Sequence, residues 1–256
     1  MHLEIPYHLR RKLLRIVGPF KYGRAGRKGS AHRIHDCPLL DFHESKCIFV
    51  HIPKAAGTSV STSLFGGTTS HYTMLHYRYF FTKTELEEYF KFTFVRNPWD
   101  RLVSAFEFLR AGGMNARDKA WASKHLSGFN SFDEFARKWV TRRNVRTMIH
   151  FVPQTTFICL QDSEPAIDFI GRYEQLEHHY EYVRRRVRTS SSTHLLALNR
   201  TSEKPRDYRS YYSDDLIRKI GDVYAEDIAI LGYDFESSAA SPAGCPAVDF
   251  EISPAG

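Results

Sequence analysis

Residues 46–59, Lys-Cys-Ile-Phe-Val-His-Ile-Pro-Lys-Ala-Ala-Gly-Thr-Ser, decide how the rest of the chain is interpreted. The apolar run 47–50 has the length of a buried strand, and the hydroxyl residues that follow Gly57 can begin a helix. A helix N-terminus presents unpaired backbone N–H groups and the positive end of the helix dipole, and a glycine lets a ligand approach the backbone closely. The stretch therefore predicts a strand, a phosphate-binding turn and a helix.

This turn differs from the G-x-x-x-x-G-K-S/T loop of nucleoside-triphosphate-binding proteins. The first glycine of that pattern is missing, Thr58 stands where its lysine would be, and the cation comes earlier, at Lys54. Lys54, Thr58 and Ser59 still supply donors for an anion. Any buried strand followed by a polar turn and a helix looks similar, so the phosphate interpretation depends on a second motif.

A second apolar run, 90–95, is followed by the sequence RNPWDRLVSAF, which begins at Arg96. Asn97 is a good N-cap, and Pro98 suits the first position of a helix. Ser104 lies two helical turns beyond Asn97 and so returns to the face on which the helix begins. We therefore expect a helix directly after Arg96, packed on the sheet by its apolar residues, with Arg96 and Ser104 able to bind one anion.

The two stretches HIPKAAGTS and FVRNPWDRLVSAF resemble the cofactor motifs of the carbohydrate sulfotransferases related to heparan sulfate 2-O-sulfotransferase and the chondroitin sulfotransferases. The resemblance continues through DFIGRYE at 168–174 and LNRTSEK at 198–204, and covers residues 46–235. Enzymes of that family take a sulfuryl group from PAPS (3′-phosphoadenosine 5′-phosphosulfate). The resemblance implies that the first motif holds the 5′-phosphosulfate and the second holds the 3′-phosphate.

By this resemblance, the residues that bind the donor come from the first motif, the second motif and a later loop. They are Lys54, Ala55, Ala56, Gly57, Thr58 and Ser59; Arg96 and Ser104; and Arg200, Thr201 and Lys204. Lys54 is also a catalytic residue in this interpretation, because a cation near the bridging oxygen stabilises the charge that grows there as the bond to sulfur breaks. A solvated basic loop is the alternative for 199–204.

The acceptor hydroxyl must lose a proton, and histidine, with a pKa of about 6.5, is a common base. Leu75-His76 resembles the Leu-His context in which the family's 2-O-sulfotransferases carry their base, so we predict His76 as the base and His71 as the second choice. The segment from His150 to Gln154 resembles a His-x-x-Pro-Gln segment of the family. We assign His71, His150 and Gln154 to the acceptor side; histidines that only pack are the alternative.

The basic charge of the chain is concentrated in its first 33 residues. They hold nine basic side chains and one acidic one, whereas the whole chain carries +7, so the rest is close to neutral. The charge therefore indicates no nucleic-acid partner, although the basic amphipathic stretch 7–17 could touch an anionic membrane surface. The four cysteines and thirteen histidines lack ligand spacing, and we expect no metal.

Apolar runs and helix signals predict a P-loop-like α/β fold: an open, mainly parallel sheet flanked by helices in a single domain. The domain is expected at 37–236, between a basic tail at 1–36 and a disordered tail at 237–256. No run is long and apolar enough to span a bilayer or to serve as a signal peptide, so we expect a cytoplasmic enzyme that could be peripheral to the membrane.

Several further elements are predicted from local signals. A capping box at 82–85 starts a helix, and 114–130 is expected to be an irregular polar loop on the acceptor side. A second capping box at 131–134 starts a basic helix that reaches Arg146 and is either solvated or in contact with an anionic saccharide. The remaining elements are strands at 155–160 and 166–170 and helices at 174–188 and 213–231.

The sequence thus predicts a sulfotransferase that moves the sulfuryl group of PAPS to a carbohydrate hydroxyl, possesses a histidine base and releases 3′,5′-ADP. The carbohydrate could itself be anionic. An atypical ATP-dependent kinase is one alternative, which the missing G-K-S/T and magnesium carboxylate disfavour. A non-enzymatic protein that binds polyanions or membrane surfaces through its basic tail is the other.

Overall fold

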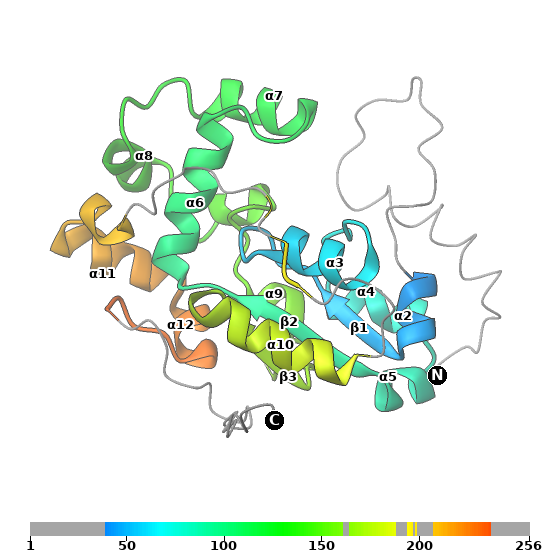
Figure 1. Cartoon of the computed structure of the whole chain (residues 1–256). Coiled ribbons are helices and arrows are strands. Elements are labelled where there is room, and N and C mark those ends of the chain that lie inside the picture. Colours follow the sequence, from blue (N-terminus) through cyan, green and yellow to red (C-terminus); the bar gives the residue numbers. More distant parts are fainter. Residues whose placement is uncertain (1–38, 161–163, 188–193, 197, 199–206, 237–256) are drawn as a thin grey trace.

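A parallel sheet of three strands forms the centre of the protein (Figure 1). This computed structural model describes residues 39–160, 164–187, 194–196, 198 and 207–236. The strands β1 (Cys47–Val50), β2 (Phe90–Val95) and β3 (Phe169–Arg172) pair in this order, with Phe49, Phe92 and Phe169 in register. The strands predicted before both motifs are confirmed, as is the α/β class with an open parallel sheet and flanking helices.

Helices connect the strands and surround them. Those before β2 are α2 (Leu39–Ser45), α3 (Gly57–Phe65), α4 (Met74–Phe80) and α5 (Lys83–Glu88). Between β2 and β3 lie α6 (Pro98–Arg110), α7 (Ala116–His125), α8 (Phe132–Lys138), the 3-10 turn η2 (Asn144–Thr147) and α9 (Thr155–Ile158). After β3 come η3 (Tyr173–Gln175), α10 (Leu176–Arg186), η4 (Tyr208–Tyr211), α11 (Asp214–Val223) and α12 (Ala225–Leu231).

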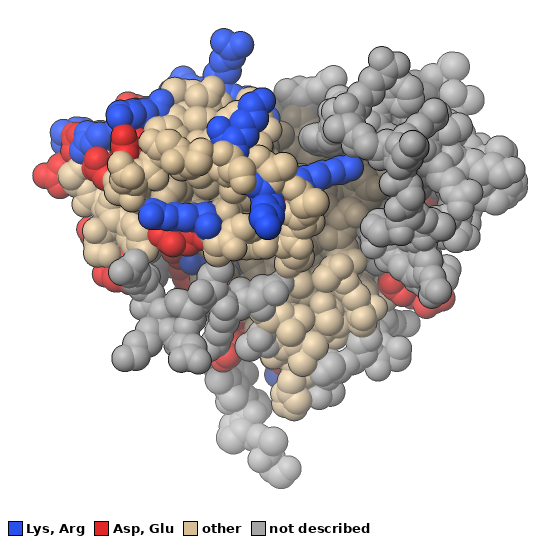
Figure 2. All heavy atoms as spheres, turned by 90° about the horizontal axis from the view of Figure 1, so that it is seen from above, with Lys and Arg blue, Asp and Glu red and all other residues tan. Residues whose placement is uncertain are grey.

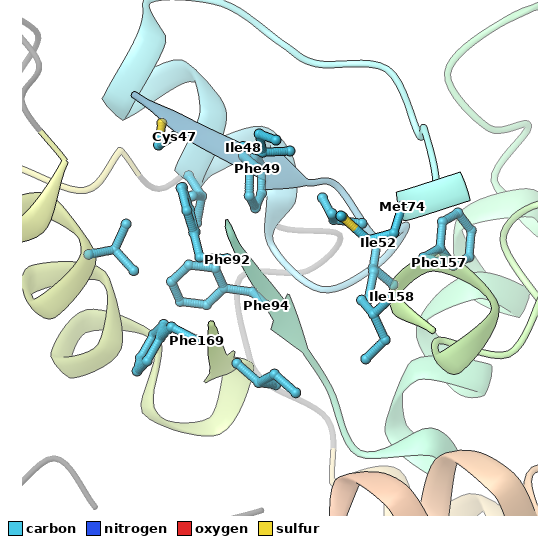
Figure 3. Packing of buried hydrophobic residues seen from close by; sticks show 14 of the residues in the cluster. Cys47, Ile48, Phe49, Ile52, Met74, Phe92, Phe94, Phe157, Ile158 and Phe169 are labelled. Carbon is cyan, nitrogen blue, oxygen red and sulfur yellow. The ribbon is translucent and has the colours of Figure 1, made fainter. Parts of the chain in front are cut away.

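The first of two hydrophobic clusters surrounds the sheet. Phe49 and Phe92 stack with their ring centroids 5.0 Å apart, and Ile158 lies in another part of the same cluster, with Met74 (Figure 3). Every residue of β1 and β3 is buried. A strand that is buried on both faces is a continuous apolar run in the sequence, as residues 47–50 are. In β2, Phe90, Phe92 and Phe94 alternate with Lys91 and Thr93, and burial is complete only from Phe92 onward.

The second cluster holds the helices that lie beyond the end of β2. Trp99, Leu102 and Phe106 of α6 pack there with Phe135 of α8 and Leu216 of α11. Figure 1 shows α6 leading away from the sheet toward α7, α8 and α11. The prediction that the apolar face of α6 packs on the sheet is therefore wrong: an apolar stripe shows that a helix is buried, and the partner depends on the tertiary fold.

Cap signals located the helix starts correctly. The Asn97 side chain accepts a hydrogen bond from the Trp99 N–H, with Pro98 as the first residue of α6, and Thr82 and Glu85 form the predicted capping box of α5. The presence and the ends of other helices were predicted less well. Residues 116–125 form α7 where we predicted an irregular loop, and α8 ends at Lys138, before the predicted basic helix reaches Arg146.

Two other elements differ from prediction. Residues 155–158 form the short helix α9 instead of a strand, and the strand predicted at 166–170 begins later, at Phe169. Short apolar runs do not distinguish a buried strand from a buried helix turn. The predicted helix at 213–231 is divided into α11 and α12 at Tyr224, and Gly232 caps α12 in the left-handed conformation. The predicted tails, 1–36 and 237–256, lie outside the described residues.

Candidate active site

The turn between β1 and α3 has the conformation of an anion-binding loop. Lys54 and Ala56 adopt left-handed backbone angles, with φ of 68° and 61°. The first helical hydrogen bond of α3 runs from the Val60 N–H to the Ala56 carbonyl. The N–H groups of the first turn, beginning with Gly57, therefore have no acceptor within the helix and are available to an anion at its positive end.

Gly57 lets the loop close against a buried histidine. A Cβ built on Gly57 would lie 1.9 Å from Cδ2 of His51 and 2.3 Å from its Nε2. The His51 ring is fixed on its other side, since its Nδ1 lies 2.9 Å from the Thr69 carbonyl oxygen. The glycine is thus required by the close approach of an aromatic ring, and His51 braces the loop.

Two buried polar side chains hold the backbone of the two motifs in place. Arg101, which is 2% exposed, donates from Nε to the Pro53 carbonyl and from Nη2 to the Val152 carbonyl, both at 2.9 Å. Gln154 is fully buried, and its amide accepts from the Arg96 N–H and donates to the Arg96 carbonyl. We predicted Gln154 on the acceptor side; the structure places it beneath the site, where it holds the backbone of Arg96.

The Arg96 guanidinium lies between the two motifs. It donates two hydrogen bonds to the Asp100 carboxylate, of 2.7 and 2.8 Å, and a third of 3.3 Å to the Lys54 carbonyl. Its plane lies over the Tyr173 ring at 4.0 Å. Burial opposes the charge, but the Asp100 carboxylate outweighs it and raises the pKa of Arg96. Arg96 is therefore a fixed, permanently charged group beside the Lys54 loop.

The Lys54 ammonium is a nearly buried cation. Its Nζ lies 4.0 Å from the centre of the Phe108 ring, a favourable cation–π contact. Within the described part of the chain, no carboxylate or carbonyl accepts a hydrogen bond from it. Burial first, and the positive charge of Arg96 second, lower the pKa of Lys54 to about 8. The negative charge of Asp118 offsets only part of this lowering, so the ammonium is suited to bind an anionic ligand.

Three histidines lie near this cation. His71 Nδ1 is 2.9 Å from the His51 carbonyl oxygen, and the centroids of the two rings are 4.2 Å apart. Burial is the largest cause that lowers the pKa of His71 to about 4, and the nearby charges of His150 and Arg101 lower it further. A carbonyl oxygen only accepts hydrogen bonds, so His71 carries its proton on Nδ1 and presents an unprotonated Nε2.

The third histidine, His150, is paired with Asp118 of α7. Its Nε2 lies 3.1 Å from Asp118 Oδ1, and the side chains are 10% and 7% exposed. The buried His150 Nδ1 has no hydrogen-bond partner among the described residues. Burial opposes ionisation of Asp118, but hydrogen bonds from His150 and from the Met114 N–H outweigh it and lower the pKa of Asp118. The Asp118 carboxylate therefore accepts from Nε2–H of His150 and fixes the orientation of the ring.

Replacing Asp118 with asparagine should destabilise the protein by about 1–3 kcal/mol at pH 7, because a buried hydrogen bond to a charged group is lost. The pKa of Asp118 is lowered in the folded state, so its contribution is present above the unfolded value of about 3.9 and is lost as pH falls through the folded value. Urea unfolding of both proteins at pH 7 and below pH 4 measures this, and the difference should narrow at the lower pH.

Asp133→Asn is the matched control, since Asp133 also lies in the first turn of a helix but its side chain is 52% exposed. We expect a change of less than about 0.5 kcal/mol for it. Equal losses for the two variants would show that the Asp118–His150 pair has no special role in stability.

His76, the predicted base, lies in the first turn of α4. Its Nδ1 accepts a hydrogen bond of 3.1 Å from the Thr73 N–H and is 2.8 Å from the Thr73 hydroxyl. This reciprocal arrangement with Thr73 caps the helix. A neutral His76 therefore has the lone pair of Nδ1 engaged and its proton on Nε2. None of the described contacts connects His76 with Lys54.

The remaining predicted donor-binding residues have different surroundings. The hydroxyls of Thr58 and Ser104 have no hydrogen-bond partner in the described part of the chain. The Ser59 hydroxyl accepts a hydrogen bond of 3.1 Å from the Leu198 N–H. One turn later, the Ser63 hydroxyl accepts a hydrogen bond of 2.8 Å from the Leu196 N–H. These bonds hold Leu196 and Leu198 beside α3. The predicted Arg200, Thr201 and Lys204 lie outside the described residues.

Sequence reasoning missed several residues that shape the site. Asp118 and Phe108 were not considered, and Arg101 was given no role although it lies within the second motif. Two signals were available: Asp118 is the one acidic residue in 108–132, and Arg101 interrupts an apolar stripe. A charge inside an apolar stripe, or a lone acid in a basic segment, indicates a buried partner that the sequence alone does not name.

The described residues contain neither a metal-binding cluster nor a helix that could span a membrane. They contain no group of three or more His, Cys, Asp or Glu side chains arranged to hold a metal ion. Their helices include none with the length and apolar character needed to cross a membrane. Cys47 and Cys159 are free thiols.

Comparison with known proteins agrees with this architecture. A sequence model of the sulfotransferase family matches residues 39–234. Carbohydrate sulfotransferase 14 of zebrafish (Danio rerio) is 33% identical over 116 residues, which cover 40% of this chain and 31% of that protein. The matched part is thus about a third of the relative's length, and no solved structure gave a significant match. Since the family model spans well over half of the sequence, this chain belongs to the sulfotransferase family.

Proposed function

We propose that the protein transfers the sulfuryl group of PAPS to a hydroxyl of a carbohydrate. The observation that carries this proposal is the contact between the two motifs: Arg96 of the second motif donates to the carbonyl of Lys54 in the first. Two cations and the free N–H groups of α3 thereby face one region, as a ligand with phosphate groups at two positions requires. Family membership and the carbohydrate sulfotransferase relative support the reaction class.

The residues divide the chemical work in the following way. PAPS, when bound, supplies a sulfuryl group that is activated by its phosphate leaving group. Lys54 and the first turn of α3 would bind the phosphosulfate, and Arg96 with Ser104 would bind the 3′-phosphate. The Lys54 ammonium would stabilise the negative charge that develops on the leaving oxygen, a stronger interaction in the transition state than in the ground state.

For the base we propose His71, the second choice from the sequence, ahead of His76. The support is the tautomer of each ring. His71 donates from Nδ1 to the His51 carbonyl and keeps an unprotonated Nε2, whereas the acceptor nitrogen of His76 is engaged by Thr73. His71 Nε2 would take the hydroxyl proton while the acceptor oxygen bonds to sulfur and 3′,5′-ADP departs. A bound anion also raises the low pKa of His71 and makes it a stronger base.

Binding of 3′,5′-ADP tests the donor site without knowledge of the acceptor. At a hundred times its dissociation constant, the nucleotide should stabilise the wild type by about 2.7 kcal/mol, and 5′-AMP, which lacks the 3′-phosphate, should stabilise it much less. Arg96→Met should remove the difference between the two nucleotides. Thermal unfolding of each protein with each nucleotide measures these effects.

Arg218→Met is the control, because Arg218 is exposed and makes no contact with the site residues described. It should respond to both nucleotides like the wild type. Stabilisation by Mg·ATP alone would instead support an ATP-dependent kinase, and equal responses of the Arg96 and Arg218 variants would contradict a 3′-phosphate site at Arg96.

A further inference from the structure

The outer surface of α7 is a basic surface with which no carboxylate of the described residues forms an ion pair. Arg117, Lys119 and Lys124 are exposed, and within the described residues none of them forms an ion pair or a side-chain hydrogen bond. Asp118 is the one acidic residue in 108–132, and it is 5% exposed because it faces inward toward His150. The surface of this segment therefore carries positive charge only.

The neighbouring helix α8 differs in this respect, although it looked equally basic in the sequence. Arg137 is bonded to Asp133 at 2.9 Å and also to Asp215, and Lys138 lies 2.6 Å from Glu134. Figure 2 looks onto this side of the molecule: acidic and basic side chains mix at the left edge, while the basic side chains nearer the centre have few acidic neighbours. Of these two helices, α7 is therefore the one whose exposed cations have no acidic partner among the described residues.

A chain of contacts connects the inner side of α7 to the candidate active site. Asp118 bonds to His150, the His150 ring is 5.0 Å from the Phe108 ring, and Phe108 lies under the Lys54 ammonium at 4.0 Å. The basic surface consequently stands beside the group that we expect to act on the donor, and a long ligand could touch both at once.

The spacing of the charges suits an extended ligand. Arg117 and Lys124 are seven residues apart, so they project from the same flank of the helix, and Lys119 projects from the opposite flank. Between them the most outward positions are the small residues Ala116, Ala120 and Ser123, which leave room along the helix. Exposed cations with no partner interact best with a ligand that carries several separate anionic groups.

We propose that Arg117, Lys119 and Lys124 bind the sulfate or carboxylate groups of an anionic carbohydrate and so direct the acceptor to the site. This inference rests on the proposed sulfotransferase function, because the acceptor is what α7 would present to Lys54 and His71. The contacts within α7 favour this surface over α8, whose cations are already paired.

The test uses the full chain and a fluorescent chondroitin sulfate oligosaccharide, with neutral dextran as the uncharged probe. In the triple variant Arg117→Gln, Lys119→Gln, Lys124→Gln, we expect about tenfold weaker binding of the anionic probe. The slope of log affinity against log salt concentration should become shallower by about two. The reason is that three contacts with sulfate or carboxylate groups, and the counterion release that accompanies them, are lost. The basic N-terminal residues are the same in all variants and cancel in the comparison.

The matched control removes three charges elsewhere: Lys138→Gln, Arg143→Gln, Arg218→Gln, all at exposed positions. It should weaken binding by less than about twofold. Equal losses in the two triple variants, or no loss in either, would overturn the proposal. The proposal would also be overturned if the α7 triple variant lost as much affinity for phosphatidylserine vesicles as for the oligosaccharide. That result would identify α7 as a membrane-binding surface.

The 3′,5′-ADP measurement separates this inference from the proposed function. If 3′,5′-ADP stabilises both triple variants like the wild type while α7 proves irrelevant to the oligosaccharide, the donor site stands and the α7 proposal fails. If the α7 variant loses the oligosaccharide but no protein responds to 3′,5′-ADP, the surface is real and the sulfotransferase function fails.

Discussion

Replacing Lys54 with methionine should lower kcat for sulfuryl transfer by about 10²–10³-fold, the usual cost of removing one group that stabilises developing charge. Methionine keeps most of the length of the side chain and an apolar end for the Phe108 ring, so the structure around the loop should remain. No described carboxylate accepts a hydrogen bond from Lys54, and Asp118, whose charge acts on it, keeps its bond to His150 in the variant. The rates are measured as release of 3′,5′-ADP from PAPS, either with an acceptor that the protein sulfates or with water as the acceptor.

The pH dependence of kcat/KM and kcat in the wild type is a second test of the role of Lys54. Burial, followed by the charge of Arg96, lowers the pKa of Lys54 to about 8. Above that pH the free protein loses the proton, and kcat/KM for the donor should fall. A bound anionic donor favours the charged lysine, so the corresponding decline in kcat should occur at higher pH.

Lys83→Met is a suitable control, because the Lys83 side chain is 71% exposed and contacts Glu87 on the same helix. It should have normal rates and an unchanged pH profile. If Lys54→Met kept the decline above pH 8, that decline would belong to another group and the role of Lys54 would be wrong.

The substitution Gly57→Ala should disrupt the phosphate loop. Its methyl group would lie 1.9 Å from Cδ2 of His51, a contact that the structure must relieve by moving the ring or the loop. The ring has little freedom, since it is 4% exposed and held by Thr69. We expect a loss of stability of about 1–3 kcal/mol, as for overpacking of a buried site, together with the loss of 3′,5′-ADP binding.

Gly67→Ala provides the comparison for this prediction. A Cβ at Gly67 would meet no atom within 4 Å. It should therefore change the free energy of unfolding by less than about 0.5 kcal/mol and leave nucleotide binding intact. Urea unfolding and nucleotide titrations of both variants decide the matter, and a Gly57→Ala protein that binds 3′,5′-ADP normally would show that the loop does not hold the donor in this conformation.

The sequence was informative where a local rule acts alone. A strand buried on both faces is a continuous apolar run, and β1 was located correctly by that rule. The alternating phenylalanines of 90–95 likewise located β2. An N-cap is a contact between near neighbours in the chain, and the start of α6 at Pro98 followed from Asn97. The rules were weaker at α9, whose four residues are equally compatible with a strand.

The candidate site was only partly predictable for the same reason. Lys54 and Arg96 come from motifs with local signatures, and the structure brings them together. The surroundings of Gln154 and His76 depended on partners that the motifs do not specify: the Arg96 backbone for one and the Thr73 cap for the other. Resemblance to a family indicated these residues, and the tertiary contacts show what each side chain touches.

By itself, the sequence determined the strands, the turn that follows β1 and the cap of α6, because these depend on residues that are close together in the chain. Only the tertiary structure decided that Asp118 meets His150 and that α7 keeps its exposed charge while that of α8 is paired with acidic groups, including Asp215 of α11. Electrostatic pairing depends on distances in space, and residues 32 or 78 positions apart meet only after the chain has folded.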